Sequence, residues 1–256
     1  MDTTYQSGTY LISFLEDYKK ISARFQKEKT QDQIFRLDKI LKEFTPIYQE
    51  HLLNEKLHAP NFNIFRIIKI SNLERLEEET HTPFLANLLS FRGSHCQQEE
   101  FYLAFLNQVK SKGIVIEHFI PKNFLYFFVE TEKHTAYGNL DILLTNREVN
   151  NEFAICIENK IGAKDQPRQL ERYYHYLDNS IYKNNILLVY LTISGTDPTE
   201  NSINHSLFDE LTKKRQLINL SYKQNIEEML INSLNSRPPS NVFSVVNQYL
   251  QIIKTF

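Results

Sequence analysis

Cysteine is scarce in this chain: among 256 residues there are two, Cys96 and Cys156. They stand far apart, without the spacing of a metal-binding motif and without the numbers of a disulfide framework. Cys156 lies inside the apolar run FAICIE, where a thiol is expected to pack as a small hydrophobic side chain. The cysteines therefore indicate neither a metal site nor a disulfide scaffold, and a reducing cytoplasm is the simplest location.

Long hydrophobic runs and an excess of basic charge are also missing. No apolar stretch approaches the ~20 residues of a membrane span, and the first residues, MDTTYQSGTYLISFLEDYKK, lack the basic leader and apolar core of a signal peptide. The formal net charge is −2, which gives no support to nucleic-acid binding, although a locally basic face is compatible with this total. We therefore expect no contact with a membrane.

The N-terminal part of the chain is poor in glycine and has a helical pattern. Apolar residues recur at helical spacing in two groups: Leu11, Ile12, Phe14, Leu15 and Tyr18, then Ile34, Leu37, Ile40, Leu41 and Phe44. This pattern predicts two amphipathic helices, packed as a hairpin. We assign residues 1–60 to an N-terminal helical extension, serving packing or dimerisation, and residues 61–256 to the main domain.

Beyond a break at His58-Ala-Pro60, helical patterns give way to short apolar runs. Thr82-Pro83 is typical of a helix start. Further helices are predicted at residues 98–109, 165–177, 226–234 and 242–253, and strands at 114–116, 124–130, 139–144, 153–158, 185–192 and 217–222. Helices on both sides of a strand-rich centre predict an α/β fold with a mixed central sheet flanked by helices.

Opposite charges end the apolar run FAICIENK at residues 153–160. Residues two apart on a strand point to the same face, so Glu158 and Lys160 are expected to project together, with Asn159 opposite. Asp141 lies in the preceding run LDILL, and the turn-like residues 145–151 predict antiparallel pairing of the two strands. Asp141 and Glu158 are then expected to share one face of the sheet.

Two neighbouring carboxylates need compensating positive charge, because they repel by about 4 kcal/mol at ~4 Å in an effective dielectric of about 20. Lys160 supplies one charge. A divalent cation such as Mg²⁺, which binds one or two carboxylates together with phosphate oxygens, would supply the rest. Such a site activates water and stabilises charge developing on phosphorus. The alternative is an ordinary surface ion pair between Glu158 and Lys160, and spacing alone does not decide between the two.

The wider sequence resembles a known enzyme family. Asp141 followed by Glu158-Asn-Lys160 resembles the D…E-x-K motif of the PD-(D/E)XK nuclease superfamily. The run IENKIGAKDQPRQLERY resembles the branch in which an I-E-N-K-I strand end precedes a helix carrying Q-L-x-x-Y. The upstream block FNIFRIIKISNLERLEEETHTPFLANLLSFRGSHCQQEEFYLAFL is similar to the N-terminal block of the same branch. The resemblance covers residues 62–195 well, the segment from Leu217 more loosely, and residues 1–60 not at all.

The resemblance implies a restriction-endonuclease-like core and metal-dependent phosphodiester hydrolysis, with Mg²⁺ or Mn²⁺ as cofactor. By position, Asp141 and Glu158 would be metal ligands and Lys160 the catalytic lysine. Gln169 would reach the active site from the helix that follows the strand. The same resemblance implies that nucleic acid, with DNA favoured, is the substrate, and that defence against foreign DNA in prokaryotes is a common role of such enzymes.

A further acidic residue would complete the metal site. By its spacing to His81, Glu78 is the residue that the resemblance selects, as both a metal ligand and a catalytic group. Its neighbour Glu79 stays open as an alternative, and so does Glu132 on the strand before Asp141.

Two arginines lie four residues apart in the predicted helix and bracket Gln169. Arg168 and Arg172 therefore share one helix face, from which they can contact phosphates of a nucleic-acid backbone. The open alternative is a solvated face on which the arginines pair with Glu171 or Asp165.

Taken together, the residues and the resemblance predict a divalent-metal-dependent nuclease, with a homodimer as the further partner to test. The alternative is a nuclease-fold protein that has lost catalysis and binds nucleic acid or a protein partner.

Overall fold

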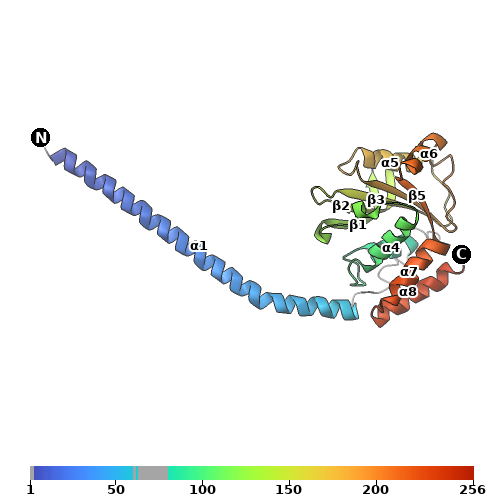
Figure 1. Ribbon diagram of the computed structural model, residues 1–256, viewed down its shortest axis with the longest axis horizontal. Coiled ribbons are helices and arrows are strands. Elements are labelled where there is room, and N and C mark those ends of the chain that lie inside the picture. Colours follow the sequence, from blue (N-terminus) through green and yellow to red (C-terminus); the bar gives the residue numbers. More distant parts are fainter. Residues whose placement is uncertain (1–2, 60–61, 63–79) are drawn as a thin grey trace. The chain divides into compact units, whose positions relative to one another are not determined.

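A computed structural model describes residues 3–59, 62 and 80–256, with side chains described from residue 16 onwards (Figure 1). The chain divides into two compact units, Met1–Asn54 and Glu55–Phe256. The predicted boundary at residues 60/61 falls six residues beyond this division, in a stretch that lies partly outside the described residues.

The described residues of the first unit all belong to one helix, which extends four residues past Asn54. The 56 residues of α1 (Thr3–His58) continue through Pro46, so the predicted hairpin of two helices is wrong. The polar segment EKTQDQ at residues 28–33, which separates the two apolar groups, contains no glycine or proline that would stop a helix. Within the described ranges, no helix of the protein is both long and apolar enough to cross a bilayer.

The second unit is built on a five-stranded sheet in the order β1-β2-β3-β4-β5. An antiparallel meander consists of β1 (Phe127–Thr135), β2 (Gly138–Asn146) and β3 (Phe153–Lys160). The strands β4 (Ile186–Thr192) and β5 (Leu217–Ser221) then add in parallel to β3. All seven residues of β4 are buried, as its continuous apolar run predicts. The mixed sheet and the β2–β3 hairpin are confirmed.

Helices cover both faces of this sheet (Figure 1). On one face, α3 (Thr82–Leu89), α4 (Glu100–Ser111), α7 (Glu227–Asn235) and α8 (Ser240–Ile253) form the larger hydrophobic layer. On the other face, α5 (Gln169–Asp178) and α6 (His205–Lys213) form the smaller one. This is the predicted restriction-endonuclease-like α/β architecture.

Several element boundaries differ from the predictions. The run at residues 114–116 is not a strand but leads into the short helix η2 (Ile116–Phe119), and η3 (Phe124–Tyr126) precedes β1. The helix α5 begins at Gln169 rather than Asp165. The helix α6 was not predicted, although its N-cap was readable: Oδ1 of Asn204 accepts the backbone N–H of Leu207 at 2.9 Å. A π-helical turn, η4 (Tyr222–Ile226), joins β5 to α7.

Candidate active site

The hairpin of β2 and β3 brings the predicted acidic residues together. Its register pairs Ile142 with Ile157, and one further step of the same register sets Asp141 directly opposite Glu158. Ile157 packs into the layer that contains α3 and α4, so Glu158, its neighbour along the strand, faces the α5 side. Lys160 is two residues on and lies on the same side. The structure therefore places Asp141, Glu158 and Lys160 on one face at the end of the hairpin.

Glu158 is a fully buried carboxylate, with 0% of its surface exposed. The Nζ of Lys160 lies 2.7 Å from its Oε1. The two groups form an ion pair, with the ammonium group in direct contact with Oε1. Apart from this contact, neither oxygen of Glu158 has a hydrogen-bond partner within the described part of the chain. Because buried polar atoms are normally hydrogen-bonded, this carboxylate is an exception that calls for an explanation.

The electrostatics of the cluster disfavour the charged form of Glu158. Burial first, and then the negative charge of Asp141, raise the pKa of Glu158 well above its usual range, and the ion pair with Lys160 acts in the opposite direction without cancelling them. Asp141 is held differently: its Oδ2 accepts the backbone N–H of Asn159 at 2.8 Å. The charged form of Glu158 is therefore disfavoured without a metal, and a cation bound beside it would remove this penalty.

The donor set fits a hard divalent cation. Mg²⁺ is usually held by one or two carboxylates and keeps several water ligands, and Asp141 and Glu158 supply two carboxylates on neighbouring strands. Among the residues that the structure describes, no three His, Cys, Asp or Glu side chains come close enough together to hold a metal. The predicted third ligand Glu78, and its alternative Glu79, lie outside the described residues.

The other alternative, Glu132, lies on β1 beside Asp141. The β1–β2 register pairs Thr131 with Ile142 and Lys133 with Leu140, which leaves Glu132 opposite Asp141. Its backbone is left-handed, with φ of 50°, a conformation that non-glycine residues rarely adopt. The alternation of residues along the predicted strand did not indicate this left-handed backbone at Glu132, which is a local feature of the edge strand β1. A role for Glu132 in the metal site stays a prediction.

Gln169 connects to the acidic cluster through Tyr173. Both side chains are buried on α5, and Nε2 of Gln169 donates to the Tyr173 hydroxyl at 3.1 Å. The Tyr173 hydroxyl in turn donates to the backbone carbonyl of Asn139 on β2. Burial, followed by the charge of Glu158, raises the pKa of Tyr173. The residues of the predicted Q-L-x-x-Y motif therefore border the site, and the catalytic role of Gln169 remains a prediction.

Of the two arginines, only Arg172 lies on α5. Arg168 precedes the helix with a left-handed backbone (φ 53°), so the two do not share one helix face as predicted. The Nε of Arg168 donates to Oε2 of Glu171 at 2.5 Å, and the Arg168 side chain is 72% exposed. Arg172 is partly buried, and its Nη2 donates to Oε1 of Gln166 at 3.4 Å. The alternative arrangement, in which an arginine pairs with Glu171, is thus present for Arg168. Phosphate binding by Arg168 and Arg172 stays a prediction.

Sequence reasoning missed two residues beside the cluster, Tyr190 and Asp165. Tyr190 pairs with Glu158 across the β3–β4 ladder, and its hydroxyl donates to Oδ1 of Asp165 at 2.9 Å. The other oxygen of Asp165 accepts the N–H and hydroxyl of Thr199 at 2.9 and 2.7 Å. The charge of Asp165 also contributes to the raised pKa of Glu158. The sequence offered Asp165 as a partner of the arginines, and its proximity to Glu158 follows from the parallel pairing of β3 with β4, through Tyr190.

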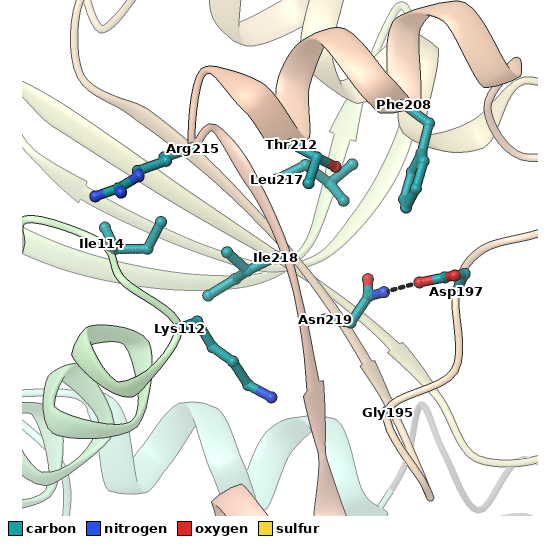
Figure 2. Close-up of a pocket in the computed structure, with 10 residues that line it drawn as sticks. All are labelled: Lys112, Ile114, Gly195, Asp197, Phe208, Thr212, Arg215, Leu217, Ile218 and Asn219. Atoms are coloured by element: carbon teal, nitrogen blue, oxygen red, sulfur yellow. Dashed lines mark hydrogen bonds between the residues drawn. The ribbon is translucent and has the colours of Figure 1, made fainter.

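A pocket of about 460 Å³ opens elsewhere, along the edge strand β5 (Figure 2). Lys112, Phe208 and Arg215 contribute to its lining, and Asn219 donates to Asp197 within it. The strand β4 separates β5 from β3, and the predicted site residues that the structure describes do not line this pocket. It is therefore distinct from the acidic cluster.

A mixed sheet between helical layers, with two acids and a lysine at the end of a central hairpin, defines a protein of the restriction-endonuclease-like class. The family model described as the PD-(D/E)XK nuclease superfamily matches residues 62–254, which include all five strands and the acidic cluster. The chain belongs to this superfamily, whose members are generally nucleases and usually use divalent metals. No curated protein and no solved structure matches the chain.

Proposed function

We propose that the protein is a divalent-metal-dependent nuclease that hydrolyses phosphodiester bonds, with DNA as the substrate. The observation that carries this proposal is the Glu158 carboxylate, which is buried beside Asp141 and, apart from its ion pair with Lys160, has no hydrogen bond to the described chain. A carboxylate left in this state is suited to a cation, which removes both the repulsion and the missing interactions.

Each residue of the cluster would have a separate role in the reaction. When bound, Mg²⁺ or Mn²⁺ lowers the pKa of a coordinated water and stabilises charge on phosphorus. Asp141 and Glu158 would hold the ion, and the Asn159 N–H would orient the Asp141 carboxylate. Lys160, whose side chain is 10% exposed, would neutralise negative charge on the phosphate or orient the attacking water. Gln169 would act beside them, with Glu78 as the predicted third acid.

A thermal-shift comparison tests the metal site. We expect Mn²⁺ to raise the Tm of the wild type, and to have little effect on Asp141→Asn. Glu130→Gln is a matched control, since its carboxylate lies on β1 and pairs with Lys133 and Arg147 instead. Equal stabilisation of the wild type and Asp141→Asn, or stabilisation of neither, would show that the metal site is wrong.

Cleavage assays separate an enzyme from an inactive nuclease-fold protein. Glu158→Ala and Lys160→Ala should each abolish Mn²⁺-dependent cleavage of single- or double-stranded DNA while the circular dichroism spectrum stays unchanged. RNA substrates in the same assay decide the nucleic acid. Cleavage that persists in purified Glu158→Ala would point to a contaminant or another site, whereas metal binding without any cleavage by the wild type would favour the inactive alternative.

We further propose that the protein forms a homodimer through α1. Its residues Ile34, Leu37, Leu41, Phe44 and Tyr48 alternate three and four residues apart and are 48–60% exposed, which is the spacing of a coiled-coil seam. The charged residues of this stretch pair within the helix, as Arg36 does with Asp32 at 2.9 Å and Lys42 with Asp38 at 2.6 Å. The seam is therefore apolar and self-complementary, which suits a second copy of the same helix.

Analytical ultracentrifugation tests this dimer. Phe44→Glu, within the seam, should convert a dimer into a monomer. Phe35→Glu is the control, because Phe35 is 68% exposed but lies one residue, about 100° of helical rotation, away from Ile34. A monomeric wild type, or equal dissociation by both substitutions, would contradict the proposal.

A further inference from the structure

Asn159 links the acidic cluster to the opposite face of the sheet. Its backbone N–H donates to Asp141 on the cluster side. Its side chain, 2% exposed, lies on the other face, where Nδ2 donates to Oγ1 of Thr82 at 3.0 Å and Oδ1 accepts the hydroxyl of Tyr222 at 2.9 Å. One residue between Glu158 and Lys160 is thus anchored from both faces.

The anchors of Asn159 belong to a larger buried group of polar side chains. His81, next to Thr82, has its Nδ1 2.7 Å from the hydroxyl of Tyr249. The His81 ring packs against Tyr222 at 6.0 Å and against Tyr249 at 5.5 Å between centroids. All of these residues are at most 5% exposed. They join β3 to the start of α3, to η4 after β5, and to α8.

A core of this kind does not need polar groups for packing. The surrounding layer is built of leucine, isoleucine, valine and phenylalanine, and an apolar residue at position 159 would continue it. Burying an amide and several hydroxyls is favourable only when every group finds its partner, and the arrangement that satisfies them is then geometrically specific. The benefit of such a network is therefore the position of its members rather than net stability.

The location of the network indicates that it positions the acidic cluster. Asn159 is covalently joined to Glu158 and Lys160, and its N–H holds Asp141, so a shift of its amide moves three members of the cluster at once. Thr82 is the first residue of α3, directly after the segment that carries the predicted acid Glu78. The same hydrogen bond therefore ties the start of α3 to the end of β3.

We propose that Asn159, Thr82 and Tyr222 are positioning residues, which hold Asp141, Glu158 and Lys160 in a metal-binding arrangement from the far side of the sheet. This proposal rests on the proposed metal-dependent function. It differs from that function in assigning a role to residues that touch neither metal nor substrate. Removing a group that orients metal ligands typically weakens metal binding by about 10- to 100-fold.

The test compares two substitutions that each remove one buried hydroxyl. Tyr222→Phe removes the donor to Asn159. Tyr102→Phe is the matched control, because Tyr102 is also fully buried in the same hydrophobic layer and its hydroxyl donates to the Phe119 carbonyl at 2.6 Å. Three experiments are done on both: hydrogen exchange of β3 peptides without metal, Mn²⁺ affinity by calorimetry, and DNA-cleavage kinetics that give kcat and KM.

We expect Tyr222→Phe to show faster exchange at the end of β3, roughly ten-fold weaker Mn²⁺ binding, and a lower kcat with little change in KM. Tyr102→Phe should match the wild type in all three, even where its Tm falls by a similar amount. Thr82→Val and Thr82→Ser form a second pair in case Tyr222→Phe does not fold. Valine should reproduce the defect, and serine, which keeps the hydroxyl, should restore wild-type behaviour.

The outcomes distinguish the two proposals. If the wild type binds no Mn²⁺, the metal-dependent function fails and the positioning role fails with it. If the wild type binds Mn²⁺ and cleaves DNA, but Tyr222→Phe and Thr82→Val bind as tightly as Tyr102→Phe, only the positioning role is overturned and the network is a packing feature.

Discussion

Replacing Glu158 by glutamine should stabilise the metal-free protein while removing its response to metal. In the metal-free wild type, the buried carboxylate of Glu158 and the half-buried carboxylate of Asp141 lie beside one ammonium group, that of Lys160. When both carboxylates are ionised, the three formal charges sum to −1. Glutamine at position 158 has nearly the same shape and no charge, so the charges of Asp141 and Lys160 would then balance.

The size of the effect follows from the burial of the side chain. Apart from its ion pair with Lys160, the buried Glu158 carboxylate has no hydrogen bond in the described chain, and an unsatisfied buried group costs about 1–3 kcal/mol. The amide of glutamine also needs partners, so the substitution recovers only a part of this cost. We therefore expect Glu158→Gln to raise the free energy of unfolding by about 1–2 kcal/mol in a chelating buffer near neutral pH. Many catalytic residues show this opposition between stability and function.

The pH dependence of stability independently checks the sign of this change in the free energy of unfolding. The folded-state pKa of Glu158 is raised, so the folded protein keeps a proton that the unfolded chain releases. Its contribution favours folding below the unfolded-state pKa of ~4.3 and is lost as the pH rises through the folded-state pKa. The gain from Glu158→Gln should therefore be small in acid and grow towards neutral pH.

Urea unfolding with EDTA, and again with Mn²⁺, measures both effects. Glu130→Gln serves as the control, since Glu130 is a partly exposed carboxylate with two cationic partners, and its loss should change stability by less than ~1 kcal/mol. Mn²⁺ should stabilise the wild type and Glu130→Gln but not Glu158→Gln. A Glu158→Gln protein less stable than the wild type in EDTA would refute the reasoning, because it would mean that the carboxylate is well satisfied.

Three further results are expected. Lys160→Met should keep Mn²⁺ binding, measured by calorimetry, yet lower the cleavage rate by roughly 10²–10³-fold; unchanged cleavage would remove the lysine from the mechanism. Arg172→Gln should reduce by about one the slope of log affinity against log salt for DNA, measured by anisotropy, if the arginine contacts phosphate; an identical slope would leave Arg172 as a structural residue. Burial lowers the pKa of His95 to about 4 from 6.5, so the unfolded chain binds more protons between these values and stability falls as the pH drops through them. His95→Gln should remove up to about 3 kcal/mol of this acid sensitivity in urea unfolding, and an unaltered pH profile would show that His95 is not buried as described.

Strands with a clear apolar pattern were predictable because their side chains report burial directly. Residues 186–191 are apolar and, with Thr192, form the inner strand β4 between β3 and β5. The turn-like residues 145–151 predicted the hairpin that places Asp141 beside Glu158. The three-residue run at 114–116 failed as a strand because so short a run has the same pattern in any conformation. The long helix α1 failed as a hairpin because apolar periodicity shows which face of a helix is apolar, not where the helix ends.

The sequence by itself determined which site residues lie close together on β3 and on its hairpin partner β2. The two-residue period of a strand is a local property of the backbone, so it places Glu158 with Lys160, and an antiparallel hairpin with a short connection adds Asp141. Only the tertiary structure decided what surrounds them. Tyr190 and Asp165 approach Glu158 through parallel pairing, and Tyr222 and Thr82 reach Asn159 from distant parts of the chain. Burial is likewise a property of the whole fold, and burial is what distinguishes Glu158 and Lys160 from an ordinary ion pair on the protein surface.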